Sequence, residues 1–395
     1  MNIKKQNFFF EFSLILILIL LFFLISNNFF VFYVGRYFNG CDMMWSPSSL
    51  FLQNINVFEI YFSNLKDQYI HCSNYPSYSL SNIFFMIPFG AFELNIAKKL
   101  WLLFNLILIF HIYFIFKKLF TEKQTYYNFI FLTFLFSKPM ILTLCIGQYG
   151  VLALWAITST IFYEKKSLIS FLGFFVAGLK YTFFPIIFYY KIYKKKYVFI
   201  ILFLLLNLTA LLIYSFKFKI GIIENFLNPL IVGSQQGGGG GDLMSVLGNH
   251  PVFPLNYLTV IISSFFYFII FYNKTVNNTE NKIIYVTLIT ITIFRHHIYD
   301  AIFLFPLFLY LIKSSNKIKF FLILIVLYFW FIYHSNFLEQ GSILPVMYTK
   351  GFRMFNFILL NMLVLFFFLD TVKPNQYIFK FKMNKLKKKF QTYVY

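Results

Sequence analysis

Long apolar runs alternate along the chain with short polar segments rich in lysine. The first run, from Phe8 to Val34, is longer than the apolar core of a secretory signal and lacks a small-residue cleavage site, so it predicts an uncleaved membrane helix. Further runs cover 97–119, 125–145, 148–162, 167–193, 197–215, 254–273, 282–312, 317–334 and 354–370. This pattern predicts an all-α, polytopic membrane protein.

Two of the runs predict hairpins of short helices. The run 167–193 lies between "EKK" and "KKK", and lysine clusters favour the cytoplasmic side at both of its ends. A break at "GLKYTFFP" leaves two arms of about a dozen residues, each ~18–20 Å long, too short to cross a hydrocarbon core of ~30 Å. The run 282–312 repeats this pattern with "RHHIYD" at its apex. Both apices should therefore lie within the depth of the membrane.

Counting each hairpin as two short helices gives about 10–12 membrane helices with both termini in the cytoplasm. Inside segments then hold 23 of the 34 Lys and Arg residues, as the positive-inside rule requires. We expect a membrane domain over 1–372 and a basic cytoplasmic tail over 373–395. The long outer loops are 35–96, with two amphipathic segments suited to the outer interface, and 216–253. Cys41 and Cys72 share the first of these loops and could form a disulfide there, whereas Cys145 should be buried.

Composition agrees with a membrane protein and excludes a soluble one. The 395-residue chain is 60% hydrophobic and 12% charged, with a mean hydropathy of +0.73. In a soluble protein a net charge of +21 would indicate nucleic-acid binding. Here most lysines lie between apolar runs, so the charge reports topology, and we expect no nucleic-acid partner.

Three places carry candidate chemistry. Asp42 follows the first span, where a carboxylate can face a water-filled cavity or simply cap the next helix. Lys180 lies at the first apex, where it must meet an anion or water, unless it extends toward an interface. Arg295, His296, His297 and Asp300 form a polar cluster at the second apex. Adjacent histidines do not share a helix face, so we expect no metal there, and "QQGGGGGDL" lacks the ending of a nucleotide loop.

The order of these motifs resembles the GT-C membrane glycosyltransferases, in particular glycosyltransferase family 87, which uses polyprenyl-phosphate-mannose. Asp42 and Trp45 are similar to the family's motif after the first span, and "GLKYTFFP" and "RHHIYDAIFLFP" to two later motifs. Further matches in order are Tyr75, Pro76, Pro88, Ala97, Trp101, Asn105, Gly147 and Gln148. The resemblance covers about residues 36–310. Ser77 replaces a family proline, Pro185 lies one residue late, and the Gly-rich loop replaces an Asn-Gln-Ser-like segment.

The resemblance implies an inverting, polyprenyl-phosphate-sugar-dependent hexosyltransferase. Because the site offers one acid and no Asp-x-Asp pair to hold a divalent ion, we expect no essential metal and no cofactor. Its partners would be the lipid-linked donor, a glycan or glycolipid acceptor outside the cytoplasm, and membrane lipids. Asp42 would be the catalytic base. The implied substrate-binding residues are Lys180, Arg295, His296, His297, Tyr75 and Gln148. A transporter or flippase of lipid-linked sugars would also have broken helices with buried charge, and a non-catalytic subunit of a glycan assembly system is a third interpretation.

Overall fold

The computed structural model describes residues 3–34, 37–40, 43–63, 65–71, 75–120, 124–180, 182–235, 243, 253–275, 278–294, 298–332 and 353–371. This described part is all-helical, with 81% of its residues in helices and no strand. Because an α-helix satisfies its own backbone hydrogen bonds, this is the fold that the apolar composition requires in lipid.

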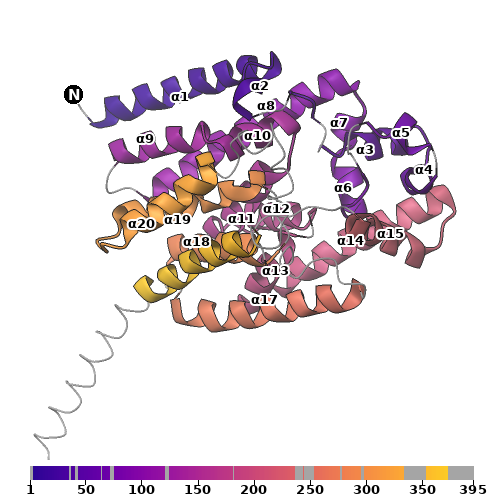
Figure 1. Cartoon of the computed structure of the whole chain (residues 1–395). Coiled ribbons are helices and arrows are strands. Elements are labelled where there is room, and N and C mark those ends of the chain that lie inside the picture. Colours follow the sequence, from indigo (N-terminus) through magenta and orange to yellow (C-terminus); the bar gives the residue numbers. More distant parts are fainter. Residues whose placement is uncertain are drawn as a thin grey trace, which may run out of the picture.

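The helices, labelled in Figure 1, have the following bounds. They are α1 (Ile3–Ser26), α2 (Val31–Val34), α3 (Trp45–Leu52), α4 (Val57–Phe62), α5 (Lys66–Tyr69), α6 (Leu80–Phe85), α7 (Ile87–Gly90), α8 (Leu94–Leu119), α9 (Gln124–Leu135), α10 (Lys138–Ile146), α11 (Gly150–Phe162), α12 (Ser167–Ala177), α13 (Phe184–Tyr193), α14 (Tyr197–Phe218), α15 (Ile222–Gln235), α17 (Phe253–Thr275), α18 (Thr279–Ile293), the 3-10 helix η2 (Ile298–Leu304), α19 (Phe305–Lys313), α20 (Lys319–Leu327) and the π-helix η3 (Tyr328–Ile332). A last helix covers Arg353–Thr371.

Three of the described helices are long and apolar enough to cross a membrane: α8, α14 and Arg353–Thr371. A fourth candidate is the pair α9 and α10, which is bent by 48°. These long helices, with several shorter apolar ones, indicate a multi-pass membrane protein. The number of crossings and the side of each loop stay predictions.

Two of the predicted single helices are broken. The run 125–145 bends between α9 and α10 because Pro139, in the first turn of α10, would clash with a carbonyl of a continuous helix. In the first run, α1 ends at Ser26, and Asn28 adopts a positive φ of 60° before α2 begins. Asparagine tolerates this left-handed conformation better than most residues, so the Asn-Asn pair ends the helix.

Both predicted hairpins double back where the sequence placed their apices. Lys191 of α13 donates a hydrogen bond to Ser170 Oγ of α12 at 2.8 Å, so the two arms run side by side. In the second hairpin, Lys313 at the end of α19 lies 3.6 Å from Glu280 at the start of α18. Lys191 lies three residues before the lysine cluster at 194–196, but its side chain is fully buried.

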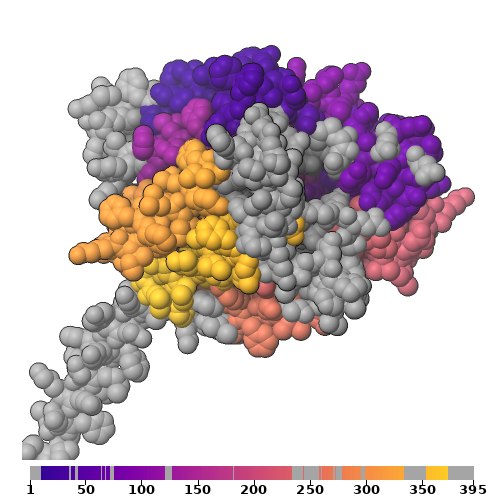
Figure 2. Space-filling model, in the orientation of Figure 1, coloured from indigo at the N-terminus to yellow at the C-terminus, as the bar shows by residue number. Residues whose placement is uncertain are grey.

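The segment predicted as the first outer loop forms α3 to α7, which gather with α14 and α15 at one end of the molecule (Figure 1). The Tyr214 hydroxyl of α14 donates to Asn56 Oδ1 at 2.9 Å, and Ser81 Oγ donates to Asn207 Oδ1 at 2.7 Å. Figure 2 shows the purple surface of this segment next to the pink surface of α15. The second predicted outer loop, 216–253, also contains a helix, because α15 occupies 14 of its residues.

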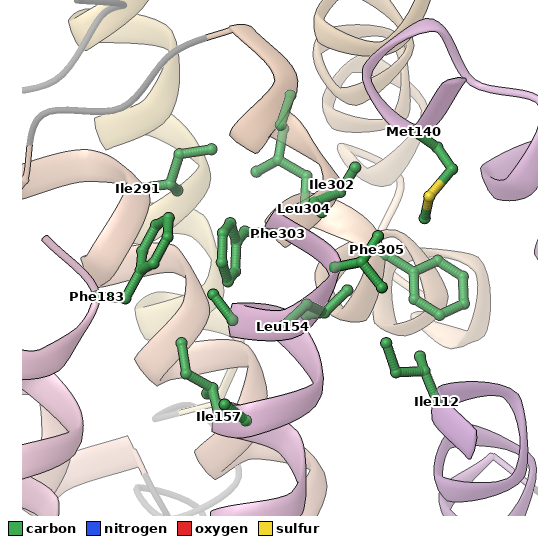
Figure 3. Close-up of a cluster of buried hydrophobic side chains, with 14 of the residues drawn as sticks. Ile112, Met140, Leu154, Ile157, Phe183, Ile291, Ile302, Phe303, Leu304 and Phe305 are labelled. Atoms are coloured by element: carbon green, nitrogen blue, oxygen red, sulfur yellow. The ribbon is translucent and has the colours of Figure 1, made fainter. Parts of the chain in front are cut away.

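The second hairpin brings the residues after its apex into the centre of the core. Ile302, Phe303, Leu304 and Phe305 are all fully buried. Figure 3 shows Phe183, from the first hairpin, beside Phe303, and their ring centroids lie 4.9 Å apart. This packing fixes the position of the polar residues that directly precede Ala301.

Candidate functional site

The apices of the two hairpins meet at a buried ion pair. Lys180, between α12 and α13, has its Nζ 4.0 Å from Oδ1 of Asp300 in η2. The two side chains are 9% and 1% exposed. A carboxylate at this distance offsets much of the cost of burying an ammonium. The sequence nominated both residues as polar groups at apices, but not as a pair.

Aromatic rings surround the Lys180 ammonium. The ring centroids of Phe183, Tyr299 and Tyr78 lie 4.5, 5.8 and 5.9 Å from Nζ. Their faces attract a cation, so they add to the stabilisation that Asp300 supplies. Tyr78 lies between α5 and α6, three residues after Tyr75, so three distant parts of the chain contribute to this centre.

Gln148, which the resemblance implies to bind substrate, belongs to the same centre. It lies in the turn between α10 and α11, and its Nε2 donates to the Tyr299 hydroxyl at 2.6 Å. Thr143 Oγ1 also lies 3.3 Å from the Tyr299 carbonyl oxygen. Gln148 therefore attaches the α10–α11 turn to the apex of the second hairpin.

The residues on both sides of Asp42 pack against this turn. Gly147 has a φ of 73°, and a Cβ added to it would lie 3.1 Å from Gly40 Cα and 3.3 Å from Met43 Cβ. The Asn39 amide donates to the Cys145 carbonyl at 3.2 Å. Asp42 itself, the predicted base, lies outside the described residues.

Tyr149, next to Gln148 in sequence, adds a hydroxyl group and an aromatic ring to this region. Its hydroxyl donates to Asn82 Oδ1 of α6 at 2.8 Å. Its ring centroid lies 5.2 Å from those of Tyr78 and Trp101. Trp101, one of the residues that carry the resemblance, donates its indole N–H to the Gly147 carbonyl at 2.9 Å. The sequence did not single out Asn82, Tyr78 or Tyr149, because no local pattern distinguishes them from other residues of the same type.

Tyr75, also predicted to bind substrate, contacts a different region. Its ring lies 5.3 Å from that of Tyr61 in α4, at the end of the molecule formed by α3 to α7. Burial, and to a smaller extent the neighbouring Tyr75, raises the pKa of the Tyr61 hydroxyl. The contact at the lysine centre comes instead from Tyr78.

The other predicted residues of the second apex, Arg295, His296 and His297, lie outside the described residues. In sequence they lie between α18 and η2, the helix that contains Tyr299 and Asp300. Within the described ranges, no group of three or more His, Cys, Asp or Glu side chains could hold a metal ion. The expected absence of a metal stays a prediction.

This arrangement places the Lys180 ammonium and the Asp300 carboxylate next to uncharged hydrogen-bonding groups. Lys180 supplies the positive charge, while Gln148 and the tyrosines supply amide and hydroxyl groups.

Cys145 was predicted to be buried, and it is buried and free in α10, next to the α10–α11 turn. A comparison with known proteins found no match among protein-family models, curated proteins or solved structures.

Proposed function

We propose that the protein is an integral-membrane glycosyltransferase that transfers a sugar, with mannose as the first candidate, from a polyprenyl phosphate to a glycan or glycolipid acceptor. The observation that carries the proposal is the meeting of both apices at Lys180 and Asp300, beside the turn that holds Gln148. Gly40 and Met43, which flank Asp42 in sequence, pack on the same turn. The residues proposed to bind the lipid phosphate and the segment that carries the proposed base thus lie close together.

In the proposed reaction, the acceptor hydroxyl oxygen attacks the anomeric carbon while the bond from that carbon to the phosphate oxygen breaks. Asp42 takes the hydroxyl proton, and the anomeric configuration inverts. Negative charge grows on the leaving phosphate, where nearby cations stabilise it. Lys180 and Arg295 have this role in the proposal.

The proposed topology has 10–12 membrane helices, both termini in the cytoplasm and the site on the outer side. Contacts at the bases of the two hairpins support it. Lys194, after α13, and Lys282, in α18, each lie 3.9 Å from a carboxylate oxygen of Glu164. The bases of the two hairpins therefore lie close together, and so do their apices. This arrangement is expected if both hairpins enter the membrane from the same side.

A transporter or flippase of lipid-linked sugars is the second candidate. The buried Lys180–Asp300 pair favours it, since ionisable residues within membrane segments often mark a substrate or ion pathway. The two functions differ in what they need. A transferase works in detergent without a gradient, whereas a transporter leaves its substrate chemically unchanged.

The deciding experiment measures sugar transfer by the purified protein in detergent, from polyprenyl-phosphate-mannose to acceptors extracted from membranes. We expect transfer by the wild type and loss of transfer in Asp42→Asn, which keeps the shape of the side chain and removes the base. Glu59→Gln is the matched control, because Glu59 is an exposed acid of the same outer segment. Wild-type transfer by Asp42→Asn would refute the assignment of the base, and glycan formation by that variant in cells would support a non-catalytic subunit.

A further inference from the structure

We infer that α15 lies in the surface of the lipid bilayer, with one side of the helix inserted among the lipids and the other packed on the protein. The partner of the inserted side is membrane lipid, in the leaflet at which α14 ends. The inference does not depend on the proposed function, because it rests on the exposed side chains of α15 and on the membrane span that precedes it.

The two sides of α15 show the reverse of the polarity that a helix facing water would have. The buried side chains recur at helical spacing and are Asn225, Asn228, Pro229 and Val232. The exposed large apolar side chains are Ile222, Ile223, Phe226, Leu227 and Ile231. Ile223 and Phe226 are 76% and 61% exposed. At ~100° per residue these five side chains fall within about half of the circumference, and Glu224 lies at the edge of that half.

The buried side of α15 is already used by the protein. The Asn225 side-chain amide donates to Ser215 Oγ of α14 at 3.0 Å, and both residues are buried. Val232 is fully buried in a cluster that also contains Tyr214 of α14 and Val57 of α4. A helix beside water would keep its asparagines outward and its apolar residues inward. The exposed apolar side of α15 therefore requires a partner that is itself apolar.

Continuity with α14 identifies this partner as lipid. α14 is long and apolar enough to cross a membrane, and Phe216 in its last turn is 82% exposed. Only three residues, 219–221, separate the end of α14 from the start of α15, and Figure 1 shows α15 next to that end. The apolar side of α15 therefore begins near the level at which α14 leaves the hydrocarbon core.

The length of α15 favours a position along the membrane surface. Its 14 residues extend over ~21 Å, which is less than the ~30 Å of a hydrocarbon core. Lys219, between the two helices, is exposed and suited to the level of the lipid headgroups. A helix of this kind inserts its apolar side ~5–10 Å into the boundary between headgroups and chains.

Lipid contact at α15 would hold α3 to α7 against the membrane. The buried cluster of Val232 joins α15 to residues of α3, α4 and α6. Lys217, just before α15, donates to the Phe51 carbonyl of α3 at 2.6 Å. In the predicted topology this is the outer surface, at which the headgroup of a lipid-linked substrate would lie.

The test places the photoreactive amino acid p-benzoylphenylalanine at Phe226 in the full chain and illuminates the protein in its native membrane. Mass spectrometry then identifies the molecules joined to residue 226. We expect lipid adducts at a yield similar to that obtained with the probe at Leu204, an exposed residue in the middle of α14. The yield should be severalfold lower with the probe at Glu59, an exposed acid of α4.

A matched pair of variants gives a second measurement. Phe226→Glu places a charge on the exposed side of α15, whereas Phe226→Leu keeps that side apolar. Insertion of a charge into lipid is costly, so backbone hydrogen exchange of α15 in lipid nanodiscs should be severalfold faster in Phe226→Glu than in Phe226→Leu. Equal exchange in the two variants would contradict insertion.

The cross-linking outcomes separate lipid from the other partners. Lipid adducts no more abundant at Phe226 than at Glu59 would mean that α15 faces water. Cross-links to this chain, to a second copy or to another protein, in place of lipid, would mean that protein covers this side. Either result would overturn the inference, and neither bears on sugar transfer, which the Asp42→Asn experiment tests.

Discussion

Replacing Lys180 by Met should destabilise the protein mainly through the carboxylate that it leaves behind. Methionine keeps an unbranched apolar stem among Phe183, Tyr78 and Tyr299 but removes the charge. Asp300 is 1% exposed, so the loss of Lys180 removes a favourable charge interaction from a buried carboxylate. Breaking a buried pair in this way costs ~3–5 kcal/mol.

The coupling between the two residues follows from their separation. At 4.0 Å, unit charges interact by about 4 kcal/mol at an effective dielectric constant of about 20. Asp300→Asn alone should also destabilise, because it leaves a buried ammonium without its carboxylate. The double variant removes both charges, so its loss should be smaller than the sum of the single losses by about 2–4 kcal/mol.

The assay is unfolding by SDS in mixed micelles, followed by tryptophan fluorescence. Trp101 and Trp330 are 1% and 0% exposed, so they report the loss of core packing. The control cycle uses Lys313→Met and Glu280→Gln, whose pair at 3.6 Å is more exposed and should couple by about 1 kcal/mol or less. Strictly additive losses at Lys180 and Asp300 would refute the electrostatic reasoning.

Three further predictions concern the donor, the topology and the turn at the site. Lys180→Met and Arg295→Met should each weaken binding of the phosphodiester donor by ~1.5–3 kcal/mol in a binding titration, and the losses should not add if both residues contact one phosphate. Cysteines replacing Lys165 and Lys195 should react with a membrane-impermeant reagent only from the cytoplasmic side. Gly147→Ala should cost about 1–2 kcal/mol of unfolding free energy, since its φ of 73° disfavours a side chain and its Cβ would meet the outer segment.

Each of these has a contrary outcome. Unchanged donor affinity in both cation variants would remove the shared phosphate site, and labelling of either cysteine from outside would contradict the hairpin topology. For the glycine, Gly221→Ala is the control, because a Cβ there would meet its nearest neighbour, Glu224 Cβ, at an ordinary 3.9 Å. Equal stability of the two glycine variants would mean that the turn tolerates a side chain.

The sequence by itself determined the helical class and the breaks in the hairpins, because both depend on local chemistry. A long run of apolar residues in lipid satisfies its backbone polar groups within the segment by forming a helix. Each hairpin run has lysines at both ends, which favours the same side of the membrane for both ends, and it is too short for two full crossings. Each run is therefore expected to double back, and the two runs do so at Lys180 and near Asp300. α8 and α14, in contrast, are long enough to cross the hydrocarbon core once.

The tertiary structure decided which residues meet. Lys180 and Asp300 come from separate hairpins, and Tyr78 contacts Lys180 from the segment between α5 and α6. The cost of a buried charge says that each needs a partner, but it does not say which one. The partner depends on how the hairpins pack, and this is set by contacts such as Phe183 on Phe303, between residues far apart in the chain.

The same reason explains why Tyr78, and not Tyr75, lies at the lysine centre. The position of α3 to α7 follows from the hydrogen bonds of Asn56 and Ser81 to α14. These bonds join segments more than a hundred residues apart, so no window of sequence contains both partners. Local patterns determine where a helix begins and ends, whereas long-range packing determines the side chains that each apex faces.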